Sequence, residues 1–68
     1  MMFASRMKIV DIFKVGKYQV LIVERIEKDF HQIEIDGVIY DVVIVHNIPN
    51  AIAIESDSNF IGKKISFL

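Results

Sequence analysis

Histidine and acidic side chains are the residues of this chain that could bind a metal ion or move a proton. A metal site needs three or four ligands that converge on one point. His31 has Asp29 two residues before it, whereas His46 could meet Asp41 or Asp57 only through tertiary folding. The two histidines do not have the spacing of successive helical turns, and the chain contains no cysteine. We therefore expect no metal site.

Hydroxyl and carboxylate side chains could support covalent or acid–base catalysis. A nucleophile needs a neighbouring base and a group that orients the base. The serines do not lie on a glycine elbow, threonine is absent, and the three glycines are isolated from one another. Glu34 and Asp41 could face each other across a hairpin, but acid–base work would require one of them to be buried. We expect a protein that is not an enzyme and that uses no cofactor.

Valine and isoleucine dominate the chain in short runs separated by turn signals, which is typical of an all-β domain. Six strands are predicted, over residues 8–13, 17–26, 32–35, 38–46, 51–55 and 64–67. Asp36 and Gly37 have the sequence of a two-residue type I′ hairpin turn. A tight turn at residues 60–62, just before the last strand, favours a six-stranded antiparallel SH3-like barrel. An OB-like barrel and a translation-factor-type barrel are the alternatives.

The length and composition indicate one globular domain. Of the 68 residues, 53% are hydrophobic and 25% are charged, which is a globular balance. We expect the domain to span residues 7–68 and residues 1–6 to form a loosely ordered extension, because Met7 begins the first strand-like pattern. No signal peptide or membrane-length apolar run is visible, so a cytoplasmic location and no membrane partner are expected.

Two of the predicted strands are apolar on both faces. A strand with one face in water alternates apolar and polar residues, but residues 20–23 and 42–45 are all valine, leucine or isoleucine. Their second face needs a cover, and a core this small supplies only about 3–5 kcal/mol. We therefore expect a protein-interaction module that self-associates or docks on a protein partner. The predicted outward-facing interface residues are Leu21, Val23, Val43 and Val45, with Ile39 beside them. The alternate residues would then form the core: Tyr18, Val20, Ile22, Val42 and Ile44. The reverse facing of the two strands is the alternative.

Basic residues near both ends of the chain indicate an alternative function. Five lysines would gather on one side if the first and last strands pair: Lys8, Lys14, Lys17, Lys63 and Lys64. Small barrels bind single-stranded nucleic acid through basic and aromatic side chains. The net charge of −1, however, gives no overall attraction to a polyanion. A nucleic-acid-binding barrel is therefore placed second to the protein-interaction module.

Overall fold

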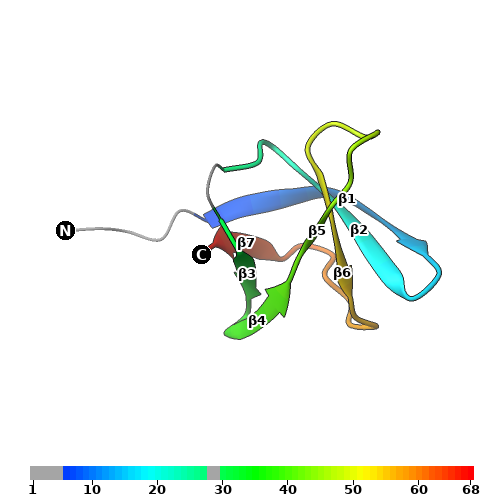
Figure 1. Cartoon of the computed structure of the whole chain (residues 1–68). Helices are drawn as coiled ribbons and strands as arrows, with labels where there is room; N and C mark the ends of the chain where they lie inside the picture. The colour runs from blue at the N-terminus through cyan, green and yellow to red at the C-terminus, as the bar shows by residue number, and fades with distance from the viewer. Residues whose placement is uncertain (1–5, 28–29) are drawn as a thin grey trace.

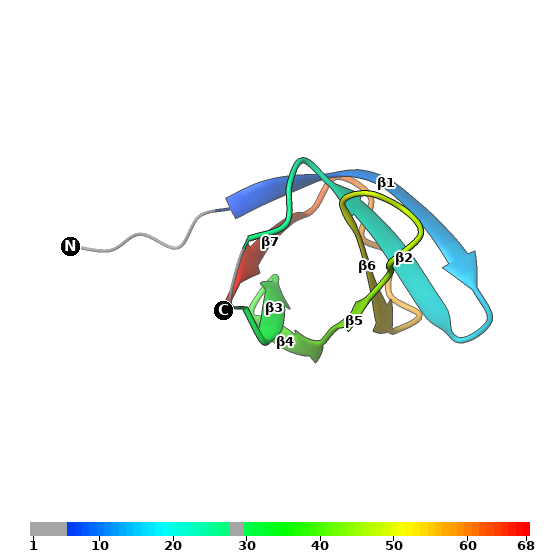
Figure 2. The same ribbon diagram turned by 45° about the horizontal axis from the view of Figure 1, so that its top comes forward.

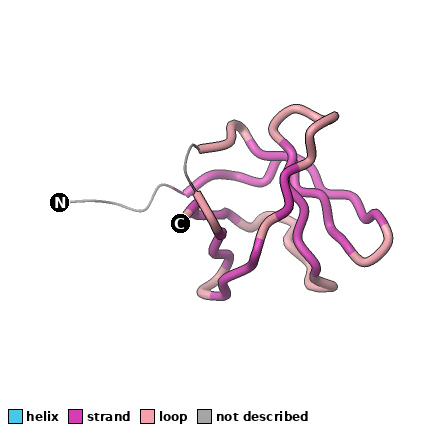
Figure 3. The backbone as a smooth tube through the Cα atoms, viewed as in Figure 1, coloured by secondary structure: helices cyan, strands magenta, loops and turns pink. Residues whose placement is uncertain are grey.

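The computed structural model describes residues 6–27 and 30–68, and within them it contains strands and no helix (Figures 1 and 3). The seven strands are β1 (Arg6–Val15), β2 (Tyr18–Val23), β3 (Gln32–Ile35), β4 (Val38–Asp41), β5 (Val43–Ile44), β6 (Ala51–Glu55) and β7 (Lys64–Phe67). All of them belong to one antiparallel sheet with the order β4-β3-β7-β1-β2-β6-β5. The all-β prediction is confirmed. The described part therefore has no helix long and apolar enough to cross a bilayer.

The sheet bends sharply along β1, which is the longest strand. Residues 6–8 of this strand pair with β7, and residues 9–15 pair with β2, with a register shift between Ile9 and Asp11. A bulge of this kind bends a strand and increases its twist. Figure 2 shows the sheet curving from β4 and β3, past β7 and β1, to β2, β6 and β5. One strand thus serves both halves of the sheet.

The two ends of the sheet, β4 and β5, are neighbours in the sequence and are joined by Val42 alone. The predicted strand over residues 38–46 is therefore wrong as one element, because it breaks at Val42 and ends at Ile44. No hydrogen-bonded ladder joins the two ends, so the predicted closed six-stranded barrel is replaced by a curved seven-stranded sheet. The predicted strands at residues 32–35, 51–55 and 64–67 are confirmed.

The main core lies on the concave face of this sheet. Its buried members come from five strands and one turn: Met7, Leu21, Val23, Ile33, Ile35, Ile52, Ile54, Phe60 and Ile65. Phe60, from the turn before β7, meets the ring of Tyr40 edge to face, with the ring centres 5.6 Å apart. The turn before β7 thus carries a core side chain.

A second, smaller apolar cluster covers the opposite face of β2 and β6. Val20, Ala51 and Ala53 are buried there. The half-buried residues packed against them are Tyr18, Ile22, Val45 and Ile48. The valine-rich strands are therefore apolar on both faces, as the sequence predicted.

The expectation for residues 1–5 lies outside the described residues. Arg6, which we placed in the loose extension, is instead the first residue of β1 and pairs with Ser66 of β7. The first strand therefore begins two residues before the predicted start at Lys8.

The hairpin between β3 and β4 has the predicted two-residue turn. Asp36 and Gly37 both have positive φ, +53° and +83°, as a type I′ turn requires. Gly37→Ala is expected to lower the free energy of unfolding by about 1–2 kcal/mol, because a Cβ disfavours this backbone region. Asp36→Asn is the matched control, since asparagine tolerates positive φ, and it should change little. Urea unfolding of both variants measures the difference, and equal stabilities would contradict the assignment.

Candidate interaction surface

A shallow apolar groove of about 360 Å³ lies on the convex face of β1, β2, β6 and β5. We call it the outer groove. Its walls come from β1 and β2 on one side and from β5 and the loop after it on the other. It is lined by Phe13, Val15, Tyr18, Val20, Val43, Val45, Asn47, Ile48 and Ala53. None of these nine residues carries a charge.

The alternation of β6 explains why this face is hollow. Ile52 and Ile54 point into the main core, whereas Ala51 and Ala53 point outward between β2 and β5. The outward residues are small, so the floor of the groove lies below the longer side chains on either side. Val43, which is paired with Ala53 in the sheet, remains 52% exposed. The groove is thus an apolar face of the sheet that no second layer of the described residues covers.

The structure places only part of the predicted interface on this groove. Val43 and Val45, two of the predicted interface residues, line it. Leu21 and Val23 do not, because they are 0% and 2% exposed in the main core. Ile39 is exposed on β4 but does not line the groove.

β2 therefore has the reverse of the facing that we named first, and Gln19 lies on its buried side. Gln19 is polar, so it indicates an outward position for itself and for the alternate residues Leu21 and Val23. In the structure Gln19 is buried, and its Nε2 donates to the backbone carbonyls of Ser56 and Ser58 at 2.8 and 2.6 Å. These bonds compensate the loss of water around the amide. Because side chains alternate between the two faces of a strand, an error of one position assigns every side chain to the wrong face.

The same reversal places several predicted core residues on the convex face. Tyr18, Val20 and Ile22 belong to the second cluster rather than to the main core. Val42 packs against the main core, but Ile44, also predicted to be core, is 42% exposed. The sequence prediction also missed Phe13, Val15 and Ile48 as groove residues. For Phe13 and Val15 the only signal was their spacing of two residues, because alternate residues of a strand lie on the same face. Ile48 had no such signal.

The five lysines of the alternative site do not gather on one patch. Lys8 and Lys64 lie directly opposite each other on β1 and β7. Lys63 is paired with Asp36, with Nζ and Oδ2 2.6 Å apart. At the far end of β1, Lys14 is paired with Asp57 at 2.9 Å, and Lys17 lies 3.8 Å from Glu55.

The ion pair with Lys14 also sets the protonation of its partner. The hydrogen bond from the Lys14 ammonium, followed by its charge, holds the pKa of the exposed Asp57 carboxyl below the ordinary value for aspartate. Both this pair and the contact between Lys17 and Glu55 are solvent-exposed, and exposed ion pairs contribute little free energy.

The side chains that could do chemistry are scattered in the described residues. Within residues 6–27 and 30–68, no three histidine or acidic residues are grouped as metal ligands. Glu34 and Asp41 do not oppose each other, since Glu34 faces Ile39 and Asp41 faces Gln32 across the β3–β4 hairpin. Glu34 instead accepts the Gly37 N–H, and Asp41 accepts the Gln32 amide at 3.0 Å. Both carboxylates thus have structural hydrogen-bond partners.

Comparison with known proteins found no match. No family model matches the chain, and neither the curated proteins nor the solved structures contain a significant match. The geometry of the outer groove is therefore the main guide to the function of this protein.

Proposed function

We propose that this protein is a small protein-interaction subunit that self-associates through its outer groove. The observation that carries the proposal is the uncharged apolar lining of the groove, together with the exposed side chains of Phe13, Val15 and Val43. Removing apolar surface from water is favourable by roughly 25 cal/mol per Å². A second copy of the same face would supply the missing layer over the second cluster.

A second copy fits this face because a two-fold dimer would place the same apolar surface of both copies in contact. In a two-fold dimer each groove meets the same groove, and here that contact would bury no lining charge. A typical stable interface needs about 800 Å² from each partner, roughly one sixth of the 4856 Å² accessible surface of the chain. Stacked sheets lie about 10 Å apart, so the side chains around the alanine floor would interdigitate.

The absolute mass in solution tests this proposal. Light scattering over a range of concentrations is expected to give twice the chain mass of 7.8 kDa, with a fall toward the single-chain mass on dilution. A particle of 7.8 kDa at every concentration would contradict self-association. Docking on a different protein through the same groove would then be the remaining form of the protein-interaction proposal.

The cytoplasmic location stays a prediction.

A nucleic-acid or other anionic ligand is the second candidate, and the arrangement of Arg6, Lys8 and Lys64 favours it. Like charges placed directly opposite each other destabilise a sheet, yet Lys8 and Lys64 form such a pair. None of the three forms an ion pair with another described residue. Binding of a single-stranded oligonucleotide that weakens with added salt would support this candidate. Absence of binding at low ionic strength would remove it.

A further inference from the structure

The far half of β1 has a partner on only one side. Residues 9–15 pair with β2, and the other side of the strand meets β7 only along residues 6–8. The last backbone contact on that side is the Ile9 N–H, which donates to the Lys63 carbonyl at 3.4 Å. Beyond this point no strand of residues 6–27 or 30–68 lies beside this edge of β1. A strand edge of this kind presents unpaired N–H and C=O groups.

A turn before β7 creates the vacancy. Residues 60–63 turn the chain away from β1, with the Lys63 N–H donating to the Phe60 carbonyl at 3.0 Å. Gly62 has φ of +78° in this turn, which glycine adopts without steric cost. If the chain before Lys64 continued straight, it would lie beside β1 at this edge. The vacant position is thus the continuation of the line of β7.

The register of the first hairpin shows which backbone groups face the vacancy. A two-residue turn makes Val15 and Tyr18 a hydrogen-bonded pair. Alternate residues direct their backbone groups to opposite sides, so those of Ile12 and Lys14 face away from β2. In agreement, the Ile12 N–H donates to the Asp11 carboxylate at 2.9 Å instead of to a strand. An incoming strand would replace this exposed local bond.

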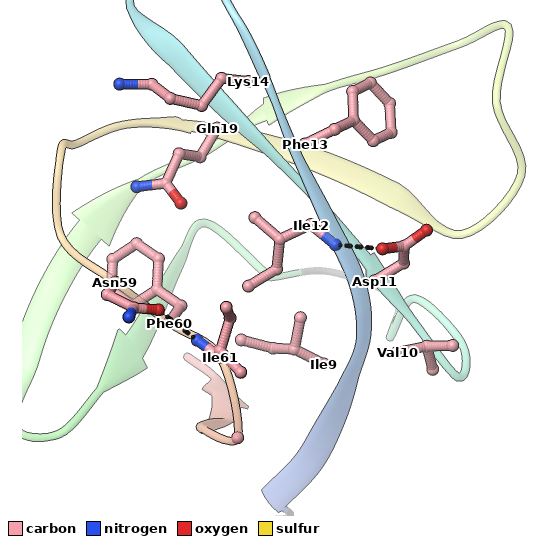
Figure 4. A pocket seen from close by; sticks show the side chains of 11 residues that line it. Ile9, Val10, Asp11, Ile12, Phe13, Lys14, Gln19, Asn59, Phe60 and Ile61 are labelled. Atoms are coloured by element: carbon pink, nitrogen blue, oxygen red, sulfur yellow. Dashed lines mark hydrogen bonds between the residues drawn. The ribbon is translucent and has the colours of Figure 1, made fainter.

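A hollow of about 490 Å³ lies beside this edge, between β1 and the turn at residues 59–62, and its lining includes the polar residues Asp11, Lys14, Gln19 and Asn59 beside the apolar ones. Ligand sites commonly have about 300–1,000 Å³. Figure 4 shows Ile9 and Ile12 of β1 extending toward Ile61 of the turn, with Phe13 on the other side of β1. Ile61 is 78% exposed. We call this space the edge hollow.

We propose that the edge hollow binds an extended segment of a partner polypeptide, which adds as an antiparallel strand to β1 in line with β7. The backbone of the segment pairs with Ile12 and Lys14, and alternate aliphatic side chains fill the space between Ile12 and Ile61. Strand addition of this kind takes its affinity from main-chain bonds and its specificity from alternate side-chain pockets. The Asp11 carboxylate at the rim favours a basic residue on the outward face of the segment.

The two walls of the edge hollow select a single strand rather than a second copy of this protein. β1 forms one wall, and residues 59–62 form the other. In a second copy, β1 is already paired with β2. If that β1 entered the edge hollow, its β2 would collide with the turn at residues 59–62. An isolated extended segment has no such neighbour. This site shares only Phe13 with the outer groove, so the two proposals can fail independently.

Titration of a probe peptide into ¹⁵N-labelled protein tests the proposal. The probe is an acetylated and amidated hexapeptide that alternates isoleucine with threonine and carries one terminal lysine. Saturable shifts of the Ile12, Lys14 and Ile61 amides are expected. Two versions carry N-methyl groups on opposite sets of alternate amides, and at least one should not bind. No shifts, shifts confined to the outer groove, or undiminished binding of both N-methylated versions would overturn the proposal.

Two exposed isoleucines provide a matched pair of protein variants. Ile61→Asp places a carboxylate in the wall of the edge hollow and should weaken peptide binding about tenfold or more. Ile39→Asp places the same charge on β4, outside the edge hollow, and should leave the affinity unchanged. Equal affinities of the two variants would overturn the proposal. So would a fall in particle mass when the peptide is added, because the edge would then be an interface between copies.

Discussion

Leu21→Ala is expected to lower the free energy of unfolding by about 2–5 kcal/mol, the usual range for deleting a buried leucine side chain. Leu21 is fully buried in the main core and pairs with Ile12 of β1 and Ile52 of β6. A core of this size supplies only about 3–5 kcal/mol. A large part of the population should therefore be unfolded at room temperature, as measured by urea titration and circular dichroism.

Ile39→Ala is the control for this substitution, because it removes a side chain of similar size from a 57% exposed position on β4. A surface change of this kind is expected to cost less than about 1 kcal/mol. Both variants should be compared at one protein concentration, since association raises apparent stability by mass action. Equal losses in the two variants would show that Leu21 does not face the main core.

Val43→Lys is expected to leave the sheet folded and to weaken self-association about 100-fold or more, which corresponds to about 2.7 kcal/mol. Val43 lies on β5, opposite Ala53, in the wall of the outer groove. In a single chain the new ammonium group can reach water. In the proposed dimer it would be buried without a partner, which is costly. Light scattering measures the species, and far-ultraviolet circular dichroism confirms the fold.

Val38→Lys is the matched control, since Val38 is 51% exposed at the start of β4 and does not line the outer groove. Its mass should equal that of the unmodified protein at every concentration. A loss of association in both variants would indicate a general effect of charge. If Val43→Lys keeps the mass of the unmodified protein, β5 does not belong to the interface.

Local signals predicted the parts of the fold that local chemistry determines. The Asp36-Gly37 turn and the short strands around it follow from residues that are close in the sequence. The break at Val42 has no comparable signal, because residues 42–45 are all β-branched and read as one continuous strand. The bend of β1 likewise depends on a register shift near Val10 that no glycine or proline marks.

The sequence predicted the apolar residues on both faces of β2, but only Val43 and Val45 of the named interface residues line the outer groove. The run Val20–Val23 has no polar residue to show which face is buried. The polar neighbour Gln19 does not mark the outward face, because its amide is satisfied by carbonyls from the loop after β6. Those partners are more than thirty residues away in the chain. Only tertiary structure shows that this glutamine is buried.

Isotope-filtered nuclear magnetic resonance on a mixture of labelled and unlabelled protein tests the central claim most directly. The claim is that the convex face of β1, β2, β6 and β5 packs against the same face of a second copy. The predicted result is intermolecular contacts among the methyl and aromatic groups of Val15, Val43, Val45 and Phe13. An absence of intermolecular contacts at high concentration, or contacts confined to other surfaces, would contradict it.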